Sequence, residues 1–144
     1  MLAELRRFYE DLVSCIHEME DEAARESPDR ARLADVRWKL SRASQRRQRF
    51  IEDIVYPYLL ERVSGSNAEK VKALRAENAT LRAASTRHVG LWTIENALQN
   101  WSDYREASAK ITASMRRRMA TEKAVLYPLL EEIEVHASLA KGRL

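Results

Sequence analysis

Residues 52–61 read EDIVYPYLLE and residues 122–131 read EKAVLYPLLE, and this pair of segments decides the fold. In both segments, apolar residues recur at helical spacing around a Tyr-Pro pair, whose proline deletes a backbone hydrogen bond and bends a helix. The two Tyr-Pro pairs lie 71 residues apart. Such an unusual feature at equivalent places predicts a tandem helix-pair repeat, roughly residues 1–64 and 67–140, and coincidence is the alternative.

The same offset relates polar residues that lie outside these segments. It takes His17 to His88 and Arg47 to Arg118. Each half therefore carries a histidine, then an arginine 30 residues later, and then Tyr-Pro nine residues after the arginine. This order supports a common ancestry of the two halves.

The composition predicts one helix-rich globular domain over residues 1–144. Hydrophobic residues make up 45% of the chain and charged residues 33%, with only three Gly and three Pro, which disfavours disorder and multi-strand sandwiches. A single Cys15 forms no internal disulfide, and charges from Glu4 onward leave no apolar stretch long enough for a signal peptide or membrane helix. We therefore expect a cytoplasmic protein without a membrane partner.

Four long segments between the helix breakers carry helical periodicity. Ser27 is predicted to cap a helix with Pro28 at its first position, where a missing N–H costs nothing. Residues 64–67, Ser-Gly-Ser-Asn, form the clearest loop, and residues 99–102 reverse the chain before the last helix. Short turns favour antiparallel neighbours, which predicts an all-α, antiparallel, up-down four-helix bundle. The expected helices are residues 2–25, 28–63, 68–98 and 103–139.

With its repeat and its two Tyr-Pro segments, nearly the full chain resembles the hemerythrin-like (HHE cation-binding) family. In that family each half supplies a His, then His-x-x-x-Glu, then Leu-Phe/Tyr-Pro-x-Leu. The resemblance implies an up-down bundle that holds a non-heme di-iron centre between its helices. The strongest local match is residues 122–131, and residues 52–61 match more weakly.

Carried over residue by residue, the family's ligand pattern is damaged in this chain. The six ligand positions fall on His17, Arg47, Ile51, His88, Arg118 and Glu122. Only His17, His88 and Glu122 keep a ligand-type side chain. Arginine is permanently protonated and has no lone pair to donate to a metal, and isoleucine has none either. The resemblance therefore implies a degenerate site, for which we expect no bound metal and no cofactor.

Helical spacing places the altered residues on core faces. Arg47 falls on an apolar stripe that continues to Ile54, Arg118 and Glu122 share the apolar face of the last helix, and His88 lies on that of the third. Because a buried unpaired charge is costly, we predict one buried polar layer of Arg47, His88, Arg118 and Glu122. In this layer Glu122 accepts hydrogen bonds from both guanidiniums.

Each of these residues also has a plainer interpretation. The two arginines could bend outward along their methylene stems and reach water. His88 could be an ordinary core histidine that a backbone or side-chain partner satisfies. His17 lies at the edge of the apolar face of its helix, where an exposed histidine is more common than a ligand.

The functional prediction is a non-enzymatic binding or regulatory protein. No catalytic residues are expected, because Cys15 lies on an apolar helix face and only Glu122 among the acids faces inward. The alternative is a metal-binding protein that uses His17, His88 and Glu122 for non-heme iron in oxygen, nitric oxide or redox-stress handling. Two neighbouring guanidiniums would oppose that metal electrostatically.

Three features bear on partners. Trp38 is predicted on the outer face of its helix, which suggests a protein partner or a homodimer, although it could also cover a neighbouring loop. Asn78 lies in a heptad pattern where a polar residue fixes register. The arginine-rich residues 46–49 and 116–118 are interleaved with acids, and the net charge is only +3, so nucleic acid is not an expected partner.

Overall fold

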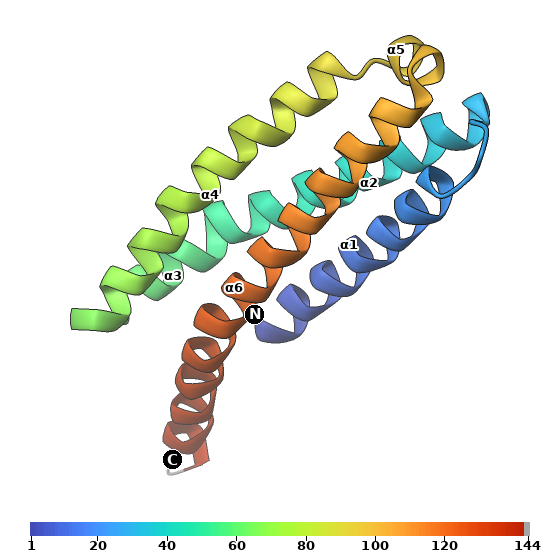
Figure 1. Ribbon diagram of the computed structural model, residues 1–144. Coiled ribbons are helices and arrows are strands. Elements are labelled where there is room, and N and C mark those ends of the chain that lie inside the picture. The colour runs from blue at the N-terminus through green and yellow to red at the C-terminus, as the bar shows by residue number, and fades with distance from the viewer. Residues whose placement is uncertain (143–144) are drawn as a thin grey trace.

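The computed structural model describes residues 1–142 and confirms the all-α class, with no strand among the described residues. Four of its elements are long helices, and shorter helical segments connect them (Figure 1). In chain order the elements are α1 (Leu2–Ala23), α2 (Arg30–Phe50), the π-helical turn η1 (Ile51–Val55), α3 (Tyr56–Leu60), α4 (Gly65–Leu91), α5 (Ile94–Gln99) and α6 (Trp101–Gly142).

Successive long helices alternate in direction along the chain (Figure 1). The helix α1 packs against α2 and α6, and α4 packs against α3 and α6. The last turns of α6 extend past the other helices at one end of the molecule (Figure 1). After the half-buried Ile133, every described residue of α6 is exposed, including Val135 and Leu139.

Apolar side chains form three buried clusters along the length of the molecule. Amphipathic helices bury one stripe each, and these stripes meet between the helices. The largest cluster joins the start of α1 to the Tyr-Pro segments and includes Leu5, Val55, Tyr56, Leu59, Leu126 and Leu130. A middle cluster contains Leu12, Ile16, Met115 and Met119. The third, at the α5 end, contains Met19, Leu33, Val36, Ala97 and Tyr104.

The two Tyr-Pro segments differ in backbone structure. Before Pro57 the helix widens into the π turn η1, in which the Tyr56 N–H donates to the Ile51 carbonyl five residues earlier. Pro128 instead lies inside the α-helix α6. The wider turn changes which side chains face the core: Tyr56 is fully buried, whereas Ile54, predicted on the core stripe, is 47% exposed.

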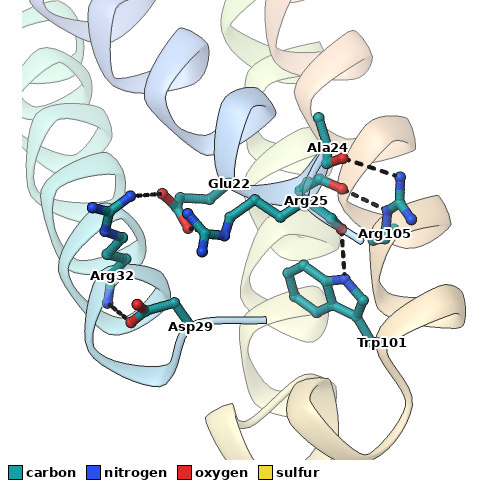
Figure 2. A network of polar contacts seen from close by, with 8 residues as sticks. Glu22, Ala24, Arg25, Asp29, Arg32, Trp101 and Arg105 are labelled. Atoms are coloured by element: carbon teal, nitrogen blue, oxygen red, sulfur yellow. Dashed lines mark hydrogen bonds and ion pairs between the residues drawn. The ribbon is translucent and has the colours of Figure 1, made fainter. Parts of the chain in front are cut away.

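The first helix–helix connection corrects the predicted cap. The helix α2 begins at Arg30 and is capped by Asp29, whose extended backbone lets its carboxylate accept from the Arg32 N–H at 3.0 Å (Figure 2). The predicted cap Ser27 and the predicted first helical residue Pro28 lie before the helix. Asp29 satisfies a free N–H of the first turn and therefore sets the start of the helix.

The other two connections also differ from prediction. Ser64 is extended and Gly65 has a positive φ of 59°, so α4 begins within the predicted loop 64–67. The predicted helix 68–98 breaks after Leu91 because Thr93 caps α5, accepting from the Asn96 N–H at 3.1 Å. The predicted turn 99–102 shrinks to the single residue Asn100.

The carboxyl end of α1 is held by side chains from the start of α6. Trp101 donates its indole N–H to the Arg25 carbonyl at 2.9 Å, and the Arg105 guanidinium donates to the Ala23 carbonyl at 2.6 Å (Figure 2). The last carbonyls of a helix have no partner within the helix. These bonds therefore satisfy α1 and attach it to α6.

Replacing Trp101 with phenylalanine is expected to lower the free energy of unfolding by about 0.5–1.5 kcal/mol, the value of one net hydrogen bond. Chemical denaturation followed by circular dichroism measures the change. Trp38→Phe is the control, because Trp38 is 59% exposed and makes no such bond. Equal stability of the Trp101→Phe variant and the unmodified protein would mean that water replaces the indole at this carbonyl.

Candidate functional site

Three charged side chains meet in the interior between α2 and α6, and we call them the Arg-Glu-Arg cluster. Arg47 comes from the last turn of α2, and Arg118 and Glu122 lie one turn apart on α6. Their exposed fractions are 3%, 8% and 1%, so the cluster is excluded from solvent. Charged side chains are almost never buried to this degree unless they are paired.

Glu122 lies between the two guanidiniums. Arg47 Nη2 forms an ion pair with Glu122 Oε2, and Arg118 Nε lies 3.7 Å from Glu122 Oε1, too far for a hydrogen bond. Two cations share one anion, which leaves the cluster with one net positive charge. Burial lowers the pKa of Arg118, and nearby Glu122 partly opposes that shift. The Nε atoms of Arg47 and Arg118 are buried without a hydrogen-bond partner in the part of the chain that the structure describes.

Asn78 of α4 and Tyr56 of α3 border the cluster. Asn78, 3% exposed, donates its side-chain N–H to the Tyr56 hydroxyl. Burial and the nearby Glu122 carboxylate raise the pKa of Tyr56 well above its usual value, so the phenol stays neutral. The polar heptad residue Asn78 thus has its partner inside this chain.

A second charged group lies at the edge of the cluster. Glu52 of η1 lies 3.2 Å from Arg75 and 3.6 Å from Arg82, both on α4, and is 15% exposed. A cavity of about 10 Å³ separates Glu52 and Asn78 from the cluster, which is room for at most one water molecule. The interior is therefore filled by ion pairs and leaves no space for a larger group.

The histidines lie away from the Arg-Glu-Arg cluster. His17 is 65% exposed, with Nδ1 3.6 Å from Glu20. His88 is half-buried and stacks on Tyr104 with ring centroids 6.2 Å apart, and burial together with the nearby Arg37 lowers its pKa. The predicted four-residue layer is therefore a three-residue cluster, because His88 lies beside Tyr104 instead.

The structure does not bring His17, His88 and Glu122 together as a ligand set. Among residues 1–142, no group of three or more His, Cys, Asp or Glu side chains is placed to hold a metal ion. Glu122 is the one carboxylate among the buried charged residues described, and its partners are guanidiniums. The surroundings of Glu122 are thus cationic, opposite to those of a carboxylate that shares a metal.

Trp38 lies on the outer surface of α2, away from the cluster. It is 59% exposed, and the Arg42 guanidinium lies 4.9 Å from the centre of its ring. Cation–π contact of this kind covers one side of the indole and leaves the rest in water. No neighbouring helix or loop buries it, so its role as a contact for a partner or a second copy stays a prediction.

Comparison with known proteins adds no relative to this description. No protein-family model, no curated protein and no solved structure matches the chain. Across the described residues, none of the helices combines the length and the apolar character that crossing a membrane requires.

Sequence reasoning missed several residues around the cluster. Glu52, Arg75 and Arg82 come from η1 and α4, and nothing in their local pattern shows that they meet. Tyr56 was part of a recognised motif, but its hydroxyl partner lies 22 residues away. The one available signal was Asn78, a polar residue on an apolar stripe, which requires a buried partner.

Proposed function

We propose that this chain is a non-enzymatic binding or regulatory protein built on a hemerythrin-like four-helix bundle whose di-iron centre has been lost. The long helices α1, α2, α4 and α6, alternating in direction, support the bundle (Figure 1). The repeat of His, Arg and Tyr-Pro at one offset supports the resemblance. Because a fold does not determine function, the proposal rests on the interior chemistry.

The Arg-Glu-Arg cluster is the observation that carries this proposal. Arg47 and Arg118 stand at two of the family's ligand positions, and both are buried against Glu122. Guanidinium groups offer no lone pair to a metal, and their charge repels a cation in a low-dielectric interior. They supply in fixed form the positive charge that would otherwise come from a metal.

The same cluster argues against acid–base catalysis. A general base needs a free carboxylate within reach of substrate, whereas Glu122 is 1% exposed and paired with Arg47. Exposed carboxylates elsewhere lie in surface ion pairs such as Lys39 with Asp35, which do not create an enclosed reaction site. The proposal is therefore a binding protein and not an enzyme.

Metal content after growth with iron tests the proposal directly. We expect less than about a tenth of an equivalent of any transition metal by elemental mass spectrometry, since the three residual ligand-type side chains are not gathered. Anaerobic incubation with Fe(II) followed by gel filtration should leave this value unchanged. Near-stoichiometric iron would overturn the proposal.

Two variants identify the ligands if iron is found. Loss of iron in Glu122→Gln and in His88→Asn would establish the alternative, a reduced iron site in oxygen, nitric oxide or redox-stress handling. The His88 variant is informative on its own because His88 is only half-buried and its loss leaves the Arg-Glu-Arg cluster intact.

A further inference from the structure

A long groove of about 410 Å³ runs between α2, α4 and α6 beside the Arg-Glu-Arg cluster. It exists because the second half of α4 presents small and polar residues there, such as Ser85 and Thr86, and buries nothing after Asn78. Along α2 the groove extends from Arg37 to Gln48, about 16 Å at the helical rise per residue. Small-molecule sites typically measure about 300–1,000 Å³.

The groove is cationic. Arg37, Arg82 and Arg118 line it, and none of its described lining residues is acidic. Arg118 is 8% exposed, and its Nε has no hydrogen-bond partner among residues 1–142. Arg37 also has a buried, unpartnered Nη1 atom in that part of the chain. Buried donors of this kind are costly, and an anion in the groove would satisfy them.

Polar and apolar lining residues are separated along the groove. Ser44 and Gln48 line both the groove and the small cavity of the cluster, so hydrogen-bonding groups surround Arg118. The apolar wall is built by Ile111 and Met115 of α6, Leu40 of α2, Val89 of α4, and Met19 and Tyr104 nearer the α5 end. A ligand that fits both ends therefore has a charged head and an apolar body.

The charge of the cluster sets the charge of that head. Two guanidiniums and one carboxylate leave one net positive charge beside the groove, and Arg82 already shares Glu52 with Arg75. A single carboxylate balances this charge, whereas a phosphate dianion exceeds it. A planar carboxylate also matches the geometry of guanidinium donors.

We propose that this groove binds a free, small amphipathic carboxylate, with the carboxylate at Arg118 and Arg82 and the apolar body along Ile111, Met115 and Leu40. The inference deepens the proposed function and rests on it, because it names the class of ligand for a metal-free binding protein.

Isothermal titration of the metal-free full chain with octanoate tests the inference. Octanoate should bind with one site per chain, and octan-1-ol, which has the same chain without the charge, should bind at least about tenfold more weakly, as expected for loss of a charged hydrogen bond. Acetate, which lacks the apolar body, and inorganic phosphate should not bind measurably. Equal affinities for octanoate and octan-1-ol, or tighter binding of phosphate, would overturn the assignment.

Paired variants on α4 locate the binding site. Arg82→Gln should weaken octanoate binding by about tenfold. Arg87→Gln, the same change on an exposed neighbour that does not line the groove, should leave it unchanged. Ser85→Trp should abolish binding by filling the groove, and it tests the location even if Arg82→Gln proves unstable. Retained affinity in both groove variants would place octanoate elsewhere and overturn the proposal.

The two hypotheses fail in different measurements. If the protein is metal-free but does not bind octanoate, the ligand assignment fails and the proposed function stands. If the protein contains stoichiometric iron, the proposed function fails whatever the titration shows.

Discussion

Replacing Glu122 with leucine is expected to lower the free energy of unfolding by about 3–5 kcal/mol, because it leaves two guanidiniums buried without an anion. Arg47 and Arg118 are 3% and 8% exposed, so neither reaches enough water to recover its hydration. A protein of ordinary stability has about 5–15 kcal/mol in total. The variant should therefore unfold at much lower urea concentrations, as measured by circular dichroism.

Arg47→Met should have an effect of similar size. It leaves Glu122 with Arg118 alone, at 3.7 Å and without a hydrogen bond. The carboxylate would then be buried with poor compensation, which costs about 3–5 kcal/mol when one member of a buried ion pair is removed. Glu132→Leu on the exposed face of α6 is the matched control for Glu122→Leu, with an expected change within about 0.5 kcal/mol.

The triple variant Arg47→Met, Arg118→Met and Glu122→Leu separates the cost of breaking the cluster from its net contribution. An apolar replacement of a whole buried ion group is often neutral or stabilising by about 1–4 kcal/mol, since no charge is desolvated. We expect the triple variant to recover most of the stability lost in either single variant. A Glu122→Leu change below about 1 kcal/mol would contradict the buried cluster, because it would mean that the arginines reach water.

If the triple variant is as stable as the unmodified protein, stability does not explain why the cluster is present. A charged cluster beside a groove without acids has another consequence, which is a fixed positive potential for an anionic ligand. The triple variant should then fold and lose octanoate affinity together with Arg118. Stability and binding thus report on different roles of the same residues.

Helical periodicity in the sequence was sufficient to predict the helical class and the interior position of three charged residues. Arg47, Arg118 and Glu122 occupy positions at which apolar neighbours recur every three or four residues, and that spacing alone places them on inner faces. Their mutual contact followed from the cost of burying a charge alone. The same reasoning misplaced His88, because a neutral imidazole can satisfy itself beside an aromatic ring such as Tyr104.

Local competition between signals explains the helix boundaries that the sequence did not reveal. Ser27 and Asp29 are both good caps, and the chain uses the second. Thr93 interrupts a segment whose apolar spacing continues past it, since capping of the Asn96 N–H outweighs helix continuation. The π turn before Pro57 has no equivalent before Pro128, so identical Tyr-Pro pairs adopt different backbones.

Long-range placement explains what no local pattern could predict. The Asn78–Tyr56 hydrogen bond and the pairing of Glu52 with Arg75 and Arg82 join residues on separate elements. The groove depends on how far α4 lies from α2 and α6, which is set by side-chain volume along all three helices. A single sequence indicates which faces are apolar but not how closely they approach.

Leu126→Ala is expected to lower the free energy of unfolding by about 2–5 kcal/mol, the range for a fully buried leucine truncated in a rigid core. Leu126 is 0% exposed and belongs to the largest cluster, where it joins α6 to the Tyr-Pro segment of α3. Close packing around it leaves a cavity that neighbouring side chains fill only in part. Urea denaturation of the two proteins, analysed with a common slope, measures the difference.

Leu139→Ala supplies the matched control because it is the same substitution on the same helix. Leu139 is 56% exposed in the part of α6 that extends past the other helices, so its truncation removes no core contact (Figure 1). Alanine also has a higher helix propensity than leucine, and the expected change is within about 0.5 kcal/mol. A loss above about 1 kcal/mol that grows with protein concentration would mean that a second copy covers this end of α6. A small change at Leu139 beside a large one at Leu126 would place the end of the apolar core near Ile133, where the exposure pattern ends it.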